Sequence, residues 1–120
     1  MQKKDEKVEL LRQLKKNGIK VACYTNSIRL TAELILCKVG VLELLDKVYT
    51  NQDVVRTKPD PEGYIKCMEY FNVGKDECVI IEDSPKGLQA AYSSGAKVYQ
   101  VKNSEDVDID IIEKLELLFL

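Results

Sequence analysis

The 120-residue sequence contains no histidine. Its absence excludes the Ser-His and Cys-His pairs on which many nucleophilic enzymes depend. The four cysteines (Cys23, Cys37, Cys67 and Cys78) lie apart among apolar neighbours and form no Cys-x-x-Cys pair. Zinc-site spacing is therefore lacking as well. Scattered cysteines of this kind are typical of free thiols in a reducing compartment, so we expect a cytoplasmic protein.

The sequence also lacks a large net charge and lacks long hydrophobic runs. The net charge of −2 leaves no basic footprint for nucleic acid. No apolar run approaches the length of a membrane span, and the charged start, Met1 to Lys7, has no apolar core of the secretory type. With 45% hydrophobic and 32% charged residues, the composition is that of a globular chain, and the length predicts one domain over residues 1–120.

Apolar runs and turn residues alternate along the chain in a way that predicts alternating strands and helices. We expect strands at 19–24, 48–49, 78–81 and 97–101, and helices at 1–17, 27–39, 61–71, 85–94 and 108–120. Ser27 is the expected N-cap of the second helix, and 51–60 is the expected loop. Strand–helix alternation favours a parallel, right-handed, three-layer α/β sheet of the Rossmann-like kind.

Two adjacent carboxylates, Glu82 and Asp83, follow the apolar strand 78–81 and precede Ser84-Pro85, where a helix begins. A buried parallel strand delivers such groups to the open end of its sheet. Mg²⁺ is commonly held by one or two carboxylates together with a substrate phosphate. The helix N-terminus offers N–H groups to the same phosphate. The alternative is a solvated turn in which Asp83 only caps the helix.

Two further segments place polar groups at comparable points. The apolar run 21–24 ends in Thr25, Asn26 and Ser27, and Lys58 precedes a proline-bracketed helix start at Pro59-Asp60-Pro61. A lysine is a suitable point charge for phosphate. The alternative is that Thr25 or Ser27 only caps the helix. Capping and phosphate binding use the same geometry, so the two roles are compatible.

A hydroxyl, a lysine and an acidic pair in this order resemble the later three motifs of the haloacid dehalogenase superfamily, in particular its phosphatase and β-phosphoglucomutase-like branch. The resemblance covers roughly Leu10 to Val101. It implies a Mg²⁺-dependent phosphoryl transfer on a small phosphorylated metabolite. Thr25 and Lys58 would be the catalytic groups that contact the phosphoryl group, Asn26 and Ser27 would bind substrate, and Glu82 and Asp83 would hold Mg²⁺. Arg29 and Arg56 are weaker candidates for substrate contacts.

The first motif of that family is missing from this sequence. The family begins with a strand that ends in Asp-x-Asp, in which the first Asp attacks phosphorus and the second is the acid/base. Asp108-Ile109-Asp110 has the spacing, but it follows a polar stretch and is better explained as the acidic first turn of the last helix. The chain thus resembles the C-terminal part of the core domain, without nucleophile strand or cap, and we expect it to be inactive alone.

The resemblance also implies where the missing strand would lie. The family sheet runs third, second, first, fourth, fifth strand, which places the absent strand between 21–24 and 79–81. Open edges on two apolar strands expose unpaired N–H and C=O groups. We therefore expect the chain to close the gap, to rearrange, to accept a strand from a partner, or to self-associate.

Other functions remain open at the level of sequence. A degenerate, non-catalytic interaction module of the same family fits the same residues. A two-component receiver domain also uses an acidic pair, a hydroxyl and a lysine. Receivers, however, place the acidic pair first in the chain, whereas here Thr25 and Lys58 precede Glu82 and Asp83. That order disfavours a receiver.

Overall fold

The computed structural model of the chain describes residues 2–103, 106–107 and 111–117. Helices and strands alternate in the order α1 (Gln2–Lys16), β1 (Ala22–Tyr24), α2 (Arg29–Val39), β2 (Lys47–Tyr49), α3 (Glu62–Phe71), β3 (Val79–Glu82), α4 (Pro85–Ser94), β4 (Lys97–Gln100) and α5 (Ile111–Leu117). Short 3₁₀ turns lie at Leu42–Leu44, Asn51–Asp53 and Lys75–Glu77. The turn predicted at Asp108-Ile109-Asp110 falls outside the described residues.

All strand pairing in the described chain is parallel, as predicted. Cys23 of β1 lies opposite Val48 of β2, and Ile80 of β3 lies opposite Val98 of β4. These pairs form two separate two-stranded sheets, one of β1 and β2 and one of β3 and β4. The four strands therefore do not form one continuous sheet. The break lies between β1 and β3, where the family resemblance places a further strand.

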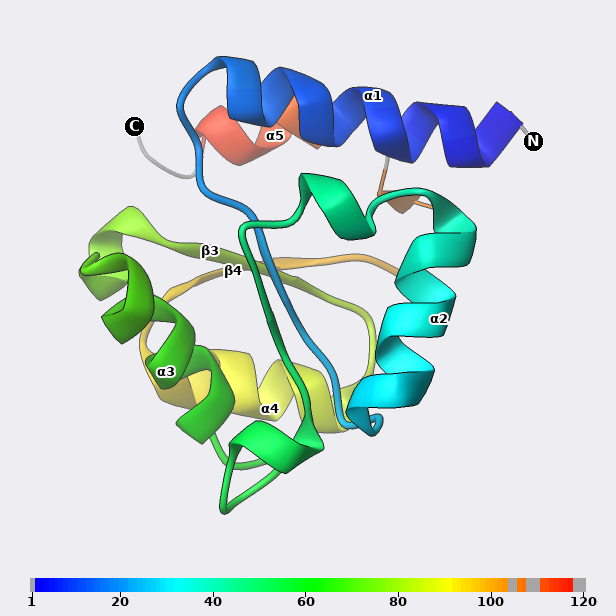
Figure 1. Cartoon of the computed structure of the whole chain (residues 1–120). Coiled ribbons are helices and arrows are strands. Elements are labelled where there is room, and N and C mark those ends of the chain that lie inside the picture. Colours follow the sequence, from blue (N-terminus) through cyan, green and yellow to red (C-terminus); the bar gives the residue numbers. More distant parts are fainter. Residues whose placement is uncertain (1, 104–105, 108–110, 118–120) are drawn as a thin grey trace.

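Helices cover both faces of the strands and complete a three-layer α/β arrangement (Figure 1). One buried cluster joins α1 and α5 to the end of β4 through Leu10, Ile111, Leu115 and Val101. The other cluster includes Tyr24, Tyr64, Met68, Ile80, Ala90 and Ala91, and so joins α3 and α4 to both sheets. Side chains therefore hold the two sheets together, since the described strands share no hydrogen bonds across the interruption.

Local backbone conformation and hydrogen bonds explain where several helices and strands begin or end. At two of these points the structure differs from the sequence prediction. Gly40 and Gly95 adopt the left-handed conformation that ends α2 and α4. The first strand begins at Ala22 rather than Ile19. Just before it, the Val21 N–H donates to the Asp46 carboxylate at 2.8 Å and so does not donate to a backbone carbonyl of β2. Ser27 does not cap α2. The capping residue is Ile28, which provides no side-chain hydrogen bond.

No helix among the described residues combines the length and the apolar character needed to cross a bilayer.

The close packing of α3 against β1 gives a test of the fold. A Cβ atom at Gly63 would overlap the ring of Tyr24. We expect Gly63→Ala to destabilise the chain by about 1–3 kcal/mol through overpacking, although alanine in a helix is normally favoured by about 1 kcal/mol. The matched control is Gly74→Ala, where the nearest atom lies at 3.5 Å. Urea unfolding of both variants measures the difference, and equal stabilities would contradict the packing of α3 on Tyr24.

Candidate active site

The carboxyl ends of β1 and β3 and the segment before α3 meet around one cavity of about 550 Å³. The cavity is lined by Thr25, Asn26, Lys58, Ser84, Pro85 and Lys86. Residues from three separate stretches of the sequence, which the family resemblance assigns to one site, thus face a common space. The lining offers two ammonium groups, two hydroxyls and an amide, which is suitable chemistry for an anion.

The turn after β1 is organised by Thr25 and Asn26. The Thr25 N–H donates to the Tyr49 carbonyl of β2 at 3.1 Å, which ties this turn to the sheet. The Thr25 hydroxyl accepts from the Ser27 N–H at 3.1 Å, and the Asn26 side-chain oxygen accepts from the Lys58 N–H at 3.3 Å. Ser27 is partly buried and does not line the cavity.

Lys58 lies between the two sheets and bonds to both. Its Nζ donates to the Glu82 carboxylate at 2.8 Å and to the Tyr24 carbonyl at 3.2 Å. The same nitrogen lies 4.9 Å and 5.2 Å from the ring centroids of Tyr24 and Tyr64, within cation–π range. The Lys58-Pro59 peptide bond is cis. Carboxylate, carbonyl and two aromatic rings therefore fix the position of this ammonium group.

Glu82 is the acceptor around which the site is built. Its Oε2 accepts from Lys58 Nζ and from the Tyr64 hydroxyl at 2.6 Å. Its Oε1 accepts from the Asp83 N–H at 3.0 Å and from the N–H and the hydroxyl of Ser84, both at 3.2 Å. Burial alone would raise the pKa of Glu82, but the hydrogen bonds from Lys58 and Tyr64 outweigh burial and lower it to about 2.

The start of α4 is fitted closely to this carboxylate. A Cβ atom at Gly87 would overlap the Glu82 carboxyl group, so a glycine is required there for packing. Ser84 caps α4 by accepting from the Gly87 N–H at 3.1 Å. The sequence motif Glu-Asp-Ser-Pro-Lys-Gly therefore encodes a strand end and a helix start that enclose one buried carboxylate.

Two residues at the site were missed by sequence reasoning. Tyr64 is a buried hydroxyl donor to Glu82, and burial together with this hydrogen bond raises its pKa far above the ordinary value. Lys86 is a second cation in the cavity lining. Its place in the first turn of α4, three residues after Asp83, was the available signal. Nothing in the sequence indicated that Tyr64 would reach Glu82.

The acidic pair fits a magnesium ion only in part. Both oxygens of Glu82 are engaged in hydrogen bonds, whereas Asp83 is exposed and no hydrogen bond of the described residues reaches its carboxylate. The described residues contain no group of three or more acidic or cysteine side chains placed to hold a metal ion. Asp83 is therefore available as a ligand, and Glu82 is not while it pairs with Lys58.

The arginines considered as substrate contacts do not line the cavity. The Arg29 guanidinium donates to Asp53 at 2.6 Å and to the Val48 carbonyl at 3.0 Å, and so ties the start of α2 to β2. Its role in this structure is to support the fold. Arg56 is exposed, and its N–H donates to the Glu62 carboxylate at 3.1 Å.

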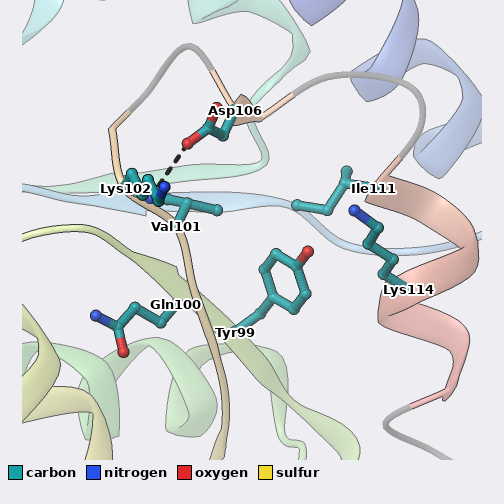
Figure 2. Close-up of a pocket in the computed structure, with 7 residues that line it drawn as sticks. All are labelled: Tyr99, Gln100, Val101, Lys102, Asp106, Ile111 and Lys114. Atoms are coloured by element: carbon teal, nitrogen blue, oxygen red, sulfur yellow. Dashed lines mark hydrogen bonds between the residues drawn. The ribbon is translucent and has the colours of Figure 1, made fainter.

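A second cavity of about 430 Å³ lies between the end of β4 and α5 (Figure 2). Asp106 accepts from the Lys102 N–H there at 3.2 Å, while Lys114 and Ile111 approach from α5. It contains none of the predicted site residues, and the chain beside it includes residues outside the described part. We assign it no role in the chemistry of the first cavity.

Residues 1–101 match the haloacid dehalogenase-like hydrolase family, and the chain therefore belongs to that family. The chain is 36% identical over 104 residues to the validoxylamine A 7′-phosphate phosphatase of Streptomyces hygroscopicus subsp. limoneus, covering 87% of this chain and 49% of that protein. It is 32% identical over 93 residues to a pyrophosphatase of Bacillus cereus, covering 78% of this chain and 43% of that enzyme.

Solved structures agree with this assignment. A Thermotoga maritima protein assigned as a β-phosphoglucomutase superposes with a TM-score of 0.78 at 26% identity, over 93% of this chain and 58% of that one. A haloacid dehalogenase-superfamily hydrolase of Ehrlichia chaffeensis shares the fold with a TM-score of 0.74, over 96% of this chain and 58% of that one. The chain thus spans about half the length of the relatives it matches.

The two buried tyrosines beside Lys58 provide a matched pair of substitutions. Their rings make an edge-on contact, with centroids 5.2 Å apart. The Tyr64 hydroxyl bonds to Glu82, whereas the buried Tyr24 hydroxyl has no partner among the described residues. We expect Tyr64→Phe to cost about 1.5–3 kcal/mol, as for a hydrogen bond to a charged group, and Tyr24→Phe to be neutral or stabilising. Urea midpoints of both variants test this, and equal losses would contradict the assigned hydrogen bond.

The lowered pKa of Glu82 predicts how the stability of the chain depends on pH. Since its folded pKa of about 2 lies below the reference value of 4.5, ionised Glu82 stabilises the fold above pH 4.5. This contribution, about 3 kcal/mol, is lost as the pH falls from 4.5 towards 2. Unfolding free energies measured across that range should fall less steeply in Glu82→Gln than in the parent chain. Parallel pH profiles would show that Glu82 is not held as an anion.

Proposed function

We propose that this chain is the phosphate-binding portion of a Mg²⁺-dependent phosphatase or phosphomutase acting on a small phosphorylated metabolite. The proposal rests mainly on one observation: Thr25, Lys58 and the start of α4 line one cavity at the carboxyl ends of β1 and β3. Its relatives include a phosphatase for a phosphorylated small molecule. The chain is then one partial core domain over residues 1–120. Its four free thiols suit the reducing cytoplasm.

In this proposal each residue acts on the transferring phosphoryl group through position and charge. The Thr25 hydroxyl donates a hydrogen bond to a phosphoryl oxygen, and Asn26 and Ser27 present the turn that receives it. Lys58, already fixed by Glu82 and the Tyr24 carbonyl, neutralises charge that develops in the transition state. Lys86 adds a second positive charge to the lining of the cavity.

Asp83 is the residue proposed to bind the magnesium ion. Glu82 stands beside it as an acceptor behind the ion, and becomes a further ligand only when it is released from Lys58. When bound, the ion supplies neutralisation of phosphate charge. Because Glu82 is engaged with Lys58, the remaining ligands must come from outside the described residues. Affinity of the isolated chain for Mg²⁺ should accordingly be millimolar or weaker, as expected from so few free oxygen ligands.

The nucleophile is the component that this sequence does not supply. An Asp at the end of a central strand would complete the reaction, so the proposal requires a strand-donating segment or a second chain. The alternative is a non-catalytic interaction module. It is supported by the ion pair between Lys58 and Glu82, because each charge is already neutralised by the other. Their side chains are each only 10% exposed.

Activity measurements distinguish these functions. With Mg²⁺ and p-nitrophenyl phosphate, we expect the chain alone to show no turnover above background, because both nucleophile and acid/base are lacking. Fused to a segment that carries a strand ending in Asp-x-Asp, it should hydrolyse the ester, and Lys58→Met should lower kcat on the order of 100-fold or more.

The matched control is Lys38→Met, which removes an exposed lysine of α2 and should leave turnover unchanged. Asp83→Asn should raise the Mg²⁺ concentration needed for half-maximal rate. Turnover by the chain alone that disappears in Asp108→Ala or Asp110→Ala would overturn the proposal and make those residues the nucleophile candidates. A folded but inactive fusion would favour the interaction module.

A further inference from the structure

The segment 54–57 leads directly into Lys58 and has little support of its own. All of its side chains except that of Val54, which packs against an apolar cluster, are exposed. Outside the helices and strands of the described chain, the segment makes one backbone–backbone hydrogen bond, in which the Thr57 carbonyl accepts from the Asp60 N–H at 3.0 Å. Burial and backbone pairing therefore do not fix the stretch that precedes Lys58.

Two side chains of α3 hold this segment instead. Glu62 is the first residue of α3, and its Oε2 accepts from the Val55 N–H at 2.8 Å while its Oε1 accepts from the Arg56 N–H at 3.1 Å. One turn further along the helix, Lys66 Nζ donates to the Asp53 carbonyl at 3.0 Å and lies 3.5 Å from Glu62 Oε2. Both oxygens of the Glu62 carboxylate are thus used on the backbone before Lys58, and Lys66 orients that carboxylate.

The position of Lys58 depends on where this backbone lies. The Lys58 N–H donates to the Asn26 side-chain oxygen at 3.3 Å, and its Nζ donates to the Tyr24 carbonyl at 3.2 Å and to Glu82 at 2.8 Å. All three bonds start from a residue only two positions after Arg56. A lysine side chain loses rotamer entropy when its head group is held, and a backbone that also moved would add to that loss.

We propose that Glu62 is a positioning residue for Lys58. Its carboxylate holds the backbone of Val55 and Arg56, and so sets the point from which the Lys58 side chain starts. Glu62 does not line the cavity, so it acts through Lys58 rather than on a bound anion. Without the bonds to Glu62, the segment gains backbone freedom, and holding the ammonium group in one place costs more entropy.

The position of Lys58 is a property of the free chain, whereas the consequence for an anion rests on the proposed function, in which Lys58 faces the phosphoryl group. The ammonium group and phosphate binding are therefore measured separately. If the parent chain does not bind inorganic phosphate, the proposed function fails. The effect of Glu62 on the Lys58 ammonium group decides the present inference in either case.

The test is NMR of the lysine ammonium groups in the full chain, with the Lys58 signal identified by its loss in Lys58→Met. The Lys58 side chain is 10% exposed and its Nζ donates two hydrogen bonds, so its ammonium protons exchange slowly with water. We expect this exchange to become about 10-fold faster in Glu62→Ala, as for the loss of a hydrogen bond to a charged group. Glu62→Gln keeps one acceptor oxygen and should show a smaller increase. Inorganic phosphate should bind about 5-fold more weakly to Glu62→Ala than to the parent chain.

Two control variants separate this role from a general loss of charge or of stability. Glu69→Gln removes an exposed carboxylate near the end of α3, and Ile111→Val trims the buried cluster that joins α1 to α5. Both should leave the ammonium exchange of Lys58 as in the parent chain. Unchanged exchange in both Glu62 variants would overturn the proposal. So would an equal increase in Ile111→Val, because Lys58 would then respond to stability and not to the bonds made by Glu62.

Discussion

The buried ion pair between Lys58 and Glu82 is the interaction on which the arrangement of this chain depends. Its two partners come from the segment before α3 and from the end of β3, and the lysine also bonds to the last residue of β1. Removing two charges from water is expensive, and such a pair is tolerated only when its remaining donors and acceptors are satisfied. Here five donor groups converge on one carboxylate, and two aromatic rings flank the ammonium group.

Several local features follow from that constraint. Gly87 has no side chain because the Glu82 carboxylate occupies the space, and Ser84 both caps α4 and donates to Glu82. Tyr64 is directed by α3 to the same oxygen as Lys58. The pair also explains how two sheets with no shared hydrogen bonds keep a defined relation at their carboxyl ends. Elsewhere they are held by the apolar cluster that includes Tyr24 and Ile80.

The same pair determines what the site can do chemically. While Glu82 neutralises Lys58, the positive charge offered to an anion comes largely from Lys86 and from the start of α4. A carboxylate or phosphate arriving next to Lys58 would share its ammonium group with Glu82.

Sequence alone determined the order of the helices and strands, the parallel pairing and the family, and it brought Thr25, Asn26 and Lys58 to the start of α4. These follow from apolar runs, turn residues and strand-end motifs, all of which are local. It did not predict that Ile28 rather than Ser27 precedes α2, because a turn closed by the Thr25 hydroxyl competes with the cap. Tertiary structure alone decided that Tyr64 and Lys58 share one oxygen of Glu82, and that the strands form two sheets. Both depend on which distant segments come within a few ångströms, and side-chain reach and strand spacing in three dimensions are not encoded in any local pattern.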